Sequence, residues 1–368
     1  MYGVIAGEIL LAKDAIEATP YTDLGPPIEI PDIPKEAFPE NISEEQREFW
    51  KSEILRLKKE RNALILAHNY QAPDVQDVAD VIGDSLKLAQ RGRESDADVL
   101  VEAAVLFMNQ ILFIMKKPHQ TVLAPSLKAL CSLAAHADPK KIREWKVKHP
   151  DGKVVSYVNT YVEVKAESDY CCASANSAPV IRYVAEKYPA SPILFLPDVY
   201  FGFYAADTLK KMGQSIDQLY LMMGACHVHD MIRAHHVRKA MLEHPDAAVV
   251  VHPECGCTSA CVRQLDAGLV SKKNMEFRST QSMIDALKDM PQKEVIVATE
   301  IGNIKPMSKA APDKIFIPAN PEAVCAFMKQ NTLKNLYESL RDMKYEIKLD
   351  SELAERAKLP ITRMLEIV

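Results

Sequence analysis

Three isolated cysteines recur at nearly equal intervals along this chain of 368 residues. Cys131 and Cys226 are 95 residues apart (131 to 226), and Cys226 and Cys325 are 99 residues apart (226 to 325). Structural zinc normally has four protein ligands, whereas a cubane iron–sulfur cluster held by three thiolates keeps one iron open as a Lewis acid. If the three thiols meet at one point, the pattern therefore favours an iron–sulfur cluster, with dehydration and carbonyl chemistry.

A hydroxyl side chain at a predicted helix start precedes each isolated cysteine. Ser85, Ser174 and Thr280 lie 46 (85 to 131), 52 (174 to 226) and 45 (280 to 325) residues before them. Helix N-termini present free backbone N–H groups and the positive end of the helix dipole, which favour phosphate or carboxylate. Plain N-capping explains any one of these hydroxyls, but three in register with three cysteines favour anion binding.

Polar clusters also end three strand-like runs, one in each third of the chain. Their side chains are those of His68, Tyr70, Tyr157, Asn159, His252 and Glu254. In open parallel sheets, ligands bind beyond the carboxyl ends of the strands. Three similar units facing one axis would thus bring the clusters, helix starts and thiols into one central cavity. Among these residues, His68, Tyr70, His252 and Glu254 are candidate proton carriers. Chance spacing is the alternative for the repeat, and a buried histidine that only stabilises its own strand end is the alternative for each histidine.

The remaining cysteines give a weaker signal. Eight cysteines are too few for a disulfide scaffold in a chain of this length. The stretch Cys255–Cys261 (Cys-Gly-Cys-Thr-Ser-Ala-Cys) has the look of a local metal clip, but its spacing fits neither zinc pairs nor ferredoxin runs. His227 and His229 follow Cys226 on a predicted loop. We interpret them as groups that lie beside the ligand without binding the metal, or as surface groups.

Short apolar runs alternate with helical stretches along most of the chain. The runs are 63–67, 98–105, 121–124, 153–158, 168–172, 192–196, 218–222, 247–251, 275–278, 294–298 and 314–317. Such runs, separated by helices, are typical of parallel sheets covered on both faces, so we predict α/β architecture. Ahead of them, Ser43 is a predicted N-cap for a helix over 44–59 that turns Trp50, Ile54 and Leu57 to the core.

Composition excludes several classes of protein. Hydrophobic residues make up 48% and charged residues 26%, which indicates a globular chain. A net charge of −5 is a poor match for a phosphate backbone, so we expect no nucleic-acid partner. The most membrane-like stretch, 99–115, is interrupted by polar residues and is shorter than the roughly 20 residues of a span. With no secretion signal evident, we expect a soluble cytoplasmic protein without a membrane partner.

The polar clusters and cysteines lie in motifs that resemble the quinolinate synthase family. The resemblance runs from about Ile65 to Leu340, and the order and spacing of the motifs make it specific. The motifs are His68-Asn-Tyr-Gln71, Ile82-Gly-Asp-Ser-Leu86, Cys131-Ser-Leu-Ala134, Tyr157-Val-Asn-Thr160, Val164-Lys-Ala166, Pro197-Asp198, Gly224-Ala-Cys-His-Val-His229, His252-Pro-Glu-Cys255, Thr299-Glu300 and Cys325-Ala-Phe-Met-Lys329.

The resemblance implies three similar three-layer αβα domains with short parallel sheets, arranged around a pseudo-threefold axis with a central active site. We place an N-terminal arm at 1–42 and the domains at 43–138, 139–238 and 239–340. A C-terminal tail over 341–368 is expected to pack back on the first domain. A [4Fe-4S] cluster would lie where the domains meet, with Cys131, Cys226 and Cys325 as its ligands and the fourth iron facing substrate.

The implied reaction belongs to de novo NAD biosynthesis. It joins iminoaspartate to dihydroxyacetone phosphate, releases phosphate and two waters, and yields quinolinate; an aspartate-oxidising enzyme would be a functional partner. By resemblance, His68 and Ser85 hold one substrate end; Tyr157, Asn159 and Ser174 hold the other, and Thr280 adds a third hydroxyl. Tyr70, His252 and Glu254 would move protons, with Glu254 as the principal acid/base.

The chain departs from the family pattern at seven positions. They are Leu106, Asn109, Gln110, Leu130, Ala135, Ala173 and Arg278. None removes a cluster ligand, but Leu130 and Arg278 stand where glycine is usual and are expected to crowd the backbone near the cavity. Two other classes stay open: a non-catalytic cluster protein acting as a sensor, and a zinc-dependent aldolase using His252, Glu254 and Cys255.

Overall fold

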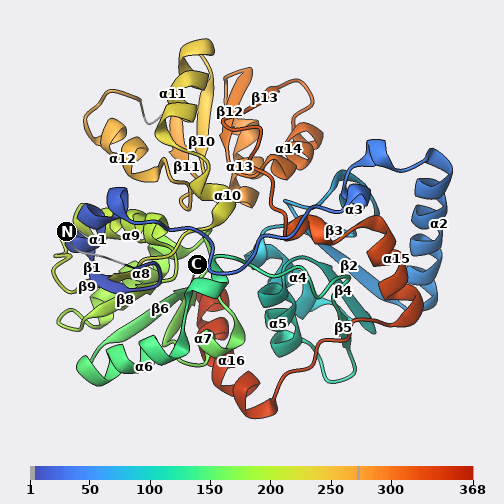
Figure 1. Cartoon of the computed structure of the whole chain (residues 1–368), viewed down its shortest axis with the longest axis horizontal. Helices are drawn as coiled ribbons and strands as arrows, with labels where there is room; N and C mark the ends of the chain where they lie inside the picture. Colours follow the sequence, from blue (N-terminus) through green and yellow to red (C-terminus); the bar gives the residue numbers. More distant parts are fainter. Residues whose placement is uncertain (1–4, 272–273, 368) are drawn as a thin grey trace. The chain divides into compact units, whose positions relative to one another are not determined.

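The chain forms an α/β protein, as its apolar runs predict (Figure 1). The computed structural model describes residues 5–271 and 274–367. These residues fall into two compact units. Unit 1 comprises the described parts of Met1–Glu29, Ser132–Ala323 and Arg356–Val368, and unit 2 comprises Ile30–Cys131 and Val324–Glu355.

Unit 2 contains a four-stranded parallel sheet. Its strands are β2 (Ala63–His68), β3 (Val81–Gly83), β4 (Val99–Ala103) and β5 (Thr121–Leu123), in the order β3-β2-β4-β5. Its helices are α2 (Glu44–Glu60), α3 (Pro73–Val78), α4 (Ser85–Glu94), α5 (Leu106–Met115) and α15 (Leu333–Asp342). Strand β2 pairs with β4 so that Ile65 lies opposite Val101.

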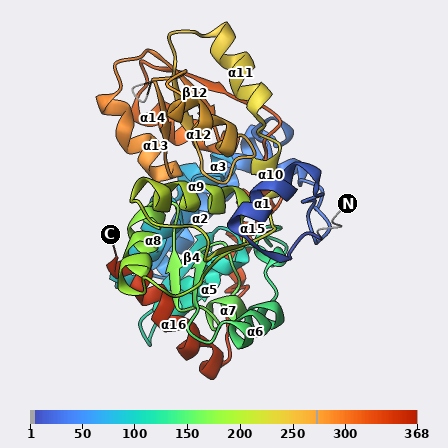
Figure 2. The same ribbon diagram turned by 90° about the vertical axis from the view of Figure 1, so that its left-hand side faces the viewer.

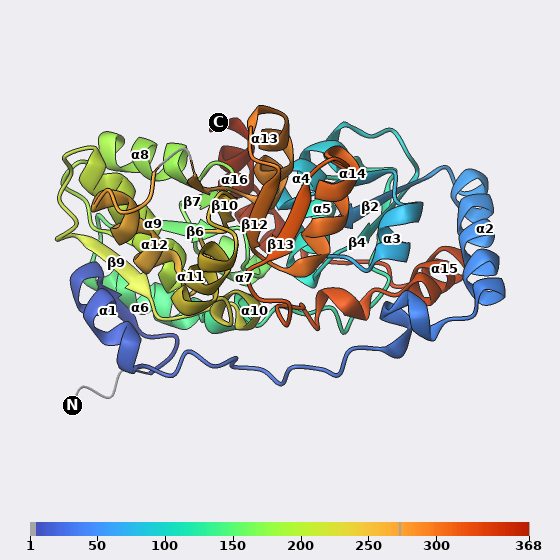
Figure 3. The same ribbon diagram turned by 90° about the horizontal axis from the view of Figure 1, so that it is seen from above.

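Successive side chains of β2 point to opposite faces of this sheet, and helices cover both faces. Ile65 and Ala67 belong to one core with α2, α3 and α15, and α15 lies beside α2 (Figures 1 and 3). Leu66 faces the other way, toward α4, where Gly92 allows a close approach to α5. A Cβ at Gly92 would lie 2.2 Å from Cδ1 of Leu112 and 3.5 Å from Cδ1 of Leu66.

Helix α2 confirms the predicted cap and apolar face. The Ser43 side chain accepts a hydrogen bond from the backbone N–H of Gln46, which satisfies one of the free donors of the first turn. Trp50, Ile54 and Leu57 are buried, as their helical spacing predicts. These side chains fix α2 against the sheet.

Unit 1 contains two sheets among its described residues. The first holds β1 (Ile9–Leu11), β6 (Lys153–Tyr157), β7 (Tyr170–Cys172), β8 (Ile193–Leu196) and β9 (Leu219–Met222), in the order β1-β9-β8-β6-β7. The second holds β10 (Ala248–Val251), β11 (Met275–Phe277), β12 (Glu294–Ala298) and β13 (Ile315–Pro318), in the order β11-β10-β12-β13. All pairs are parallel except β1 with β9.

Helices of unit 1 flank both sheets (Figure 1). They are α1 (Ala12–Ala18), α6 (Pro139–Lys148), α7 (Val162–Lys165), α8 (Ser177–Lys187), α9 (Val199–Lys211), α10 (His227–Asp230), α11 (Ala234–Glu243), α12 (Thr258–Asp266), α13 (Thr280–Ala286) and α14 (Ile304–Ala310). Short 3-10 helices of unit 1 lie at Thr19–Tyr21, Ala134–His136, Leu287–Asp289 and Ile301–Asn303, and those of unit 2 lie at Lys35–Ala37, Pro39–Asn41 and Met328–Gln330.

The three sheets share one strand order. Within each parallel set, the strand that comes first in the sequence lies between the second and the third, and the fourth lies beyond the third. The order therefore reverses at the first strand each time, which places a topological switch point beside its carboxyl end. This common topology agrees with the repeat that the cysteine spacing indicates.

All eleven predicted runs coincide with strands, and two strands escaped prediction. Strand β3 is only three residues long. Strand β1 lies in the proline-rich arm and pairs antiparallel with β9, so part of that arm is an edge strand. Neither segment has enough alternation to stand out in the sequence.

The predicted C-terminal tail divides between the two units. In unit 2, the backbone N–H of Tyr345 donates to the Ala124 carbonyl just beyond β5, and that of Ile347 donates to the Val122 carbonyl within β5. Helix α16 (Ser351–Glu366) lies beside the start of α8 (Figures 2 and 3), where Asn176 donates to the Met364 carbonyl over 2.7 Å. Over the described range, no helix has both the length and the apolar character needed to cross a bilayer.

Candidate active site

The predicted polar clusters lie at the carboxyl ends of equivalent strands. Strand β2 ends at His68, β6 ends at Tyr157, and His252 follows the last residue of β10. Each is the first strand of its parallel set, so each cluster lies at a switch point, where open sheets bind ligands.

Glu254 joins the clusters of the two sheets in unit 1. The Tyr157 hydroxyl donates a short hydrogen bond to Oε1 of Glu254, and Nδ2 of Asn159 donates to the same oxygen over 3.4 Å. Nδ1 of His252 lies 3.6 Å from Oε1. The structure thus brings together four predicted site residues that are up to 97 residues apart in sequence.

Glu254 is a carboxyl group held away from water. Its residue is 2% exposed, and burial raises its pKa to about 7, although the hydrogen bond from Tyr157 opposes that shift. Its other oxygen, Oε2, is buried without a hydrogen-bond partner among the described atoms. A carboxyl group with a pKa near neutrality can both accept and donate a proton, as general acid–base catalysis requires.

Cys226 and His229 lie beside this carboxyl group. One ligating atom from each of Cys226, His229 and Glu254 falls within 4.8 Å of the other two. Cys226 is the N-cap of α10, and the His229 ring stacks on the His252 ring at a centroid distance of 4.7 Å. The predicted loop was wrong, because residues 227–230 are helical. His229 is 2% exposed, which excludes the surface alternative for this residue and leaves a place beside the Cys226 ligand.

Unit 2 places the first cluster against the loop that carries Cys325. The His68 and Tyr70 rings meet edge to face, with centroids 4.6 Å apart. Lys329 donates a short hydrogen bond to the Tyr70 carbonyl, and the backbone N–H of Lys329 donates to the Cys325 carbonyl over 3.1 Å. One lysine therefore ties the turn after β2 to the segment that holds the third isolated cysteine.

The predicted hydroxyls start helices at two of three positions. Ser85 is the first residue of α4 after the N-cap Asp84, and Thr280 is the first residue of α13 after the N-cap Ser279. Ser174 does not start a helix, because α8 begins at Ser177. There the Asn176 side chain accepts a hydrogen bond from the Ala173 backbone N–H over 2.8 Å, which closes a turn around Ser174 instead.

The isolated cysteines differ from the other thiols in their accessibility. Cys131, Cys226 and Cys325 are half-buried, whereas the other five are buried; all eight lie in the described ranges. Each of the three lies in the loop after the fourth strand of its parallel set, β5, β9 or β13. A metal binds the thiolate, and a partly accessible thiol loses its proton more readily than one in an apolar core. These three residues fit a cluster better than the buried ones.

Comparison with known proteins identifies the family of the chain. Residues 52–366 match the family model described as Quinolinate synthetase A protein. The chain belongs to the quinolinate synthetase A family. It is 42% identical over 315 residues to a quinolinate synthase of Thermus thermophilus, and the match covers 86% of this chain and 96% of the relative.

Two other quinolinate synthases show the same extent of similarity. The Pyrobaculum aerophilum enzyme is 43% identical over 316 residues, which cover 86% of this chain and 99% of the relative. The Mycobacterium tuberculosis enzyme is 38% identical over 320 residues, which cover 87% of this chain and 89% of the relative. The similarity therefore spans both units, and all three relatives are named as enzymes.

Two further family motifs supply buried groups to which we assigned no role from sequence. Asp198 caps α9 by accepting from the Phe201 N–H over 2.8 Å, and burial together with the nearby Glu254 raises its pKa well above the usual range. Lys165 donates to the Val158 carbonyl over 2.8 Å and so holds the loop that presents Asn159. Their place in quoted motifs beyond β6 and β8 was the signal available in the sequence.

Two departures from the family pattern have structural explanations. Nδ2 of Asn109 donates to the Glu102 carbonyl over 2.9 Å and contacts its carboxyl at 3.3 Å, so Asn109 supports a buried acid. The Arg278 side chain pairs with Glu276 over 2.6 Å, and its backbone N–H bonds to Val251 beyond the end of β11.

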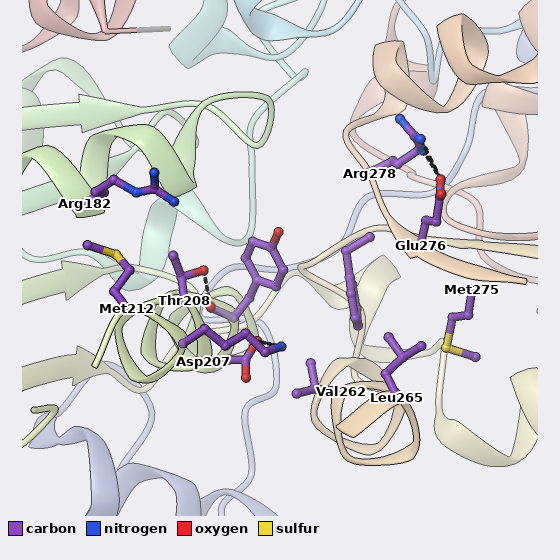
Figure 4. A pocket seen from close by; sticks show the side chains of 12 residues that line it. Arg182, Asp207, Thr208, Met212, Val262, Leu265, Met275, Glu276 and Arg278 are labelled. Carbon is purple, nitrogen blue, oxygen red and sulfur yellow. Dashed lines mark hydrogen bonds and ion pairs between the residues drawn. The ribbon is translucent and has the colours of Figure 1, made fainter. Parts of the chain in front are cut away.

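The Arg278 side chain lines a surface cavity of unit 1 and does not lie beside Glu254. This cavity, of about 570 Å³, lies between α9, α12 and β11, and Figure 4 shows the Arg278–Glu276 pair at its margin. Its lining residues are Arg182, Tyr204, Asp207, Thr208, Lys211, Met212, Val262, Leu265, Met275, Glu276, Phe277 and Arg278. Tyr157, Asn159, His252 and Glu254 are not among them.

Proposed function

We propose that this chain is a quinolinate synthase that condenses iminoaspartate with dihydroxyacetone phosphate. The products are quinolinate, one phosphate and two waters. The observation that carries the proposal is Glu254, a buried carboxyl group with a pKa of about 7, held by Tyr157 and Asn159 beside Cys226 in a member of this family.

A [4Fe-4S] cluster bound by Cys131, Cys226 and Cys325 is part of the proposal. The support is chemical: these are the three half-buried thiols, and each follows the fourth strand of its sheet. When bound, such a cluster supplies an iron with an open coordination position, which acts as a Lewis acid.

The chain's own residues would bind substrates and move protons around that centre. His68 and Ser85 would hold one substrate end, and Tyr157, Asn159 and Ser174 the other, with Thr280 contributing a third hydroxyl. Ser85 and Thr280 open helices, where free N–H groups favour phosphate or carboxylate.

Condensation, isomerisation and ring closure each require proton transfer. Glu254 would accept and return protons at its carboxyl oxygens, and the Tyr157 hydroxyl would hold the carboxyl in place. His252 Nδ1, 3.6 Å from Oε1, would exchange protons with it, and Tyr70 would serve the substrate end bound near His68.

The shared strand order supports three similar αβα domains around a pseudo-threefold axis with a central site. We place these domains at 43–138, 139–238 and 239–340, after an arm over 1–42. Of the predicted tail 341–368, the segment around Tyr345 and Ile347 returns to the first domain, whereas α16 bonds to Asn176 of the second. The activity places the enzyme in de novo NAD biosynthesis, in the cytoplasm, with an aspartate-oxidising enzyme as supplier of iminoaspartate.

An anaerobic assay tests the function directly. Purified, cluster-reconstituted protein is incubated with both substrates, quinolinate is measured, and iron, zinc and visible absorption are recorded on the same sample. We expect quinolinate together with about four irons per chain and little zinc. A cluster without quinolinate would favour a sensor, and zinc without iron would favour an aldolase.

A further inference from the structure

We propose that unit 1 carries a mononuclear divalent-cation site formed by the Cys226 thiolate, a ring nitrogen of His229 and the Glu254 carboxylate. Zinc is the ion that this mixed sulfur, nitrogen and oxygen donor set prefers. The site goes beyond the proposed function, because all three ligands belong to unit 1 and neither Cys131 nor Cys325 takes part.

The spacing of the donor atoms suits one ion. The three atoms lie within 4.8 Å of one another. Zinc holds sulfur at about 2.3 Å and nitrogen or oxygen at about 2.0–2.2 Å, so ligands of a tetrahedral site are about 3.5 Å apart. Side-chain shifts on the order of 1 Å would therefore close the site. Three protein ligands leave a fourth position for water, as in catalytic zinc sites.

Glu254 supplies an oxygen that needs a partner. Oε1 accepts from Tyr157 and Asn159, whereas Oε2 is buried with no hydrogen-bond partner in the described part of the chain. A buried acceptor without a partner costs about 1–3 kcal/mol, and more if it is charged. A cation bound at Oε2 would give that acceptor a partner and remove the cost.

A hydrogen-bond chain presents His229 in the form that binds metals. The Cys255 thiol points at the Ala298 carbonyl, 3.2 Å from its sulfur, so its single proton goes there. The sulfur can then only accept from Nδ1 of His229, 3.3 Å away, which places the ring proton on Nδ1 and the lone pair on Nε2. Metal-binding histidines usually donate their second N–H in this manner.

Cys226 gives an incoming metal ion access to the site, and it also links zinc binding to cluster binding. Its thiol is half-buried, and zinc binding would release the thiol proton to solvent. Because Cys226 is also a proposed cluster ligand, a zinc ion and the cluster exclude each other. Protein that has lost its cluster would hold Cys226 as a zinc thiolate until zinc is removed.

Zinc titration of cluster-free protein tests the site. The full chain is purified anaerobically without reconstitution, stripped with a chelator, and titrated with Zn²⁺ against a chromophoric chelator; Co²⁺ replaces Zn²⁺ for absorption spectra. We expect about one ion per chain and a thiolate-to-cobalt charge-transfer band. Cys226→Ser should abolish that band, and His229→Ala and Glu254→Gln should each weaken zinc binding by about 100-fold or more. His235→Ala, at an exposed histidine, is the matched control and should bind as the parent does.

A second pair of variants tests the hydrogen-bond chain. Cys255→Ala removes the sulfur that accepts from Nδ1 of His229 and should weaken zinc binding by about 10- to 100-fold. Cys261→Ala removes another buried thiol of the same stretch, and it should leave zinc affinity unchanged.

The outcomes separate this site from the cluster. Cys131→Ser and Cys325→Ser should lose the cluster but keep zinc affinity, whereas His229→Ala should lose zinc affinity but still assemble the cluster. Absence of zinc binding, or zinc affinity unchanged by Cys226→Ser or His229→Ala, would overturn the site even if the enzyme makes quinolinate. Failure to assemble a cluster would count against the proposed function and leave the zinc result standing.

Discussion

Two sets of three cysteines differ both in their spacing along the chain and in their burial. Cys255, Cys257 and Cys261 lie close together in the chain, as ligands of one metal often do, yet all three are buried. Burial raises the pKa of Cys255, and hydrogen bonds within the set raise those of Cys257 and Cys261. The other set, Cys131, Cys226 and Cys325, is dispersed over the chain but half-buried throughout.

Under the proposed assignment, the metal ligands are the thiols that can reach the thiolate form and not those that lie closest together in the chain. A thiol whose pKa is raised stays protonated at neutral pH and packs as a small apolar side chain. The compact set therefore supports the fold around Glu254, whereas the dispersed set keeps the accessibility that a ligand needs. Glu254 directly precedes Cys255 in the chain, and a carboxylate oxygen of Glu254 lies within 4.8 Å of the Cys226 sulfur.

The largest expected effect distinguishes the two sets by activity. Cys131→Ser, Cys226→Ser and Cys325→Ser should each remove the cluster and reduce quinolinate formation to background, because each removes one of three ligands. Cys257→Ser and Cys261→Ser serve as matched controls and should retain both. Iron content, visible absorption and quinolinate assays measure the outcome; loss of the cluster in Cys257→Ser with retention in Cys226→Ser would reverse our assignment.

Glu254→Gln should separate chemistry from cluster binding. The amide keeps the shape of the side chain but cannot exchange a proton, so turnover should fall by about 100- to 10,000-fold while iron content stays at about four per chain. Anaerobic steady-state kinetics measure the change, with Glu243→Gln, at an exposed glutamate, as control. Unchanged turnover would remove Glu254 from the mechanism.

The raised pKa of Glu254 should also appear in the stability of cluster-free protein. The folded pKa of about 7 lies above the unfolded value near 4.5, so the folded state holds the proton more tightly. Its contribution to stability is complete below pH 4.5 and is lost as pH rises through 7, by on the order of 3 kcal/mol. Urea unfolding of wild type and Glu254→Gln between about pH 4.5 and 8 checks this; parallel pH dependence in the two proteins would contradict it.

Thiol labelling should distinguish the sets without any mutation. In folded, cluster-free protein, Cys131, Cys226 and Cys325 should react with iodoacetamide at least about 10-fold faster than the buried five, because the thiolate must be both formed and reached. Mass spectrometry of digested protein after timed labelling reads each site. Fast labelling of Cys257 or Cys261 would show that the compact set is accessible after all.

The smallest expected effect concerns packing in the compact set. Cys261→Ala removes one buried sulfur and should reduce the free energy of unfolding by about 1 kcal/mol, measured by urea unfolding. Cys325→Ala, at a half-buried thiol, is the control and should change it by less. A larger loss at Cys325 than at Cys261 in cluster-free protein would mean that the two sets were assigned the wrong roles.

Much of the fold followed from local pattern, because buried parallel strands are short apolar runs whatever their partners are. The Ser43 cap and the Trp50, Ile54 and Leu57 face of α2 were predicted from spacing alone. Strand β3 was missed because its flanking residues do not extend it into an apolar run, as they do for the equally short β5. Strand β1 was missed because it lies in the proline-rich arm, and the pairing of both strands depends on segments elsewhere in the chain.

The candidate site was predicted as a set of residues but not as a geometry. Spacing identified Tyr157 and Glu254, yet nothing local indicates that their side chains meet across 97 residues. His229 was misread because its burial depends on Cys255 and His252, which come from the segment after β10. Helix α8 begins later than predicted because the Asn176 side chain competes for the backbone of the preceding turn.

An anaerobic crystal structure with iron anomalous data tests the central claim most directly. We predict a single iron–sulfur centre bonded to the sulfurs of Cys131, Cys226 and Cys325, with one iron free of protein sulfur and the Glu254 carboxyl beside it. Sulfur atoms of these three residues more than about 10 Å apart, with no shared iron peak, would contradict the account, because a cubane cannot bridge that distance.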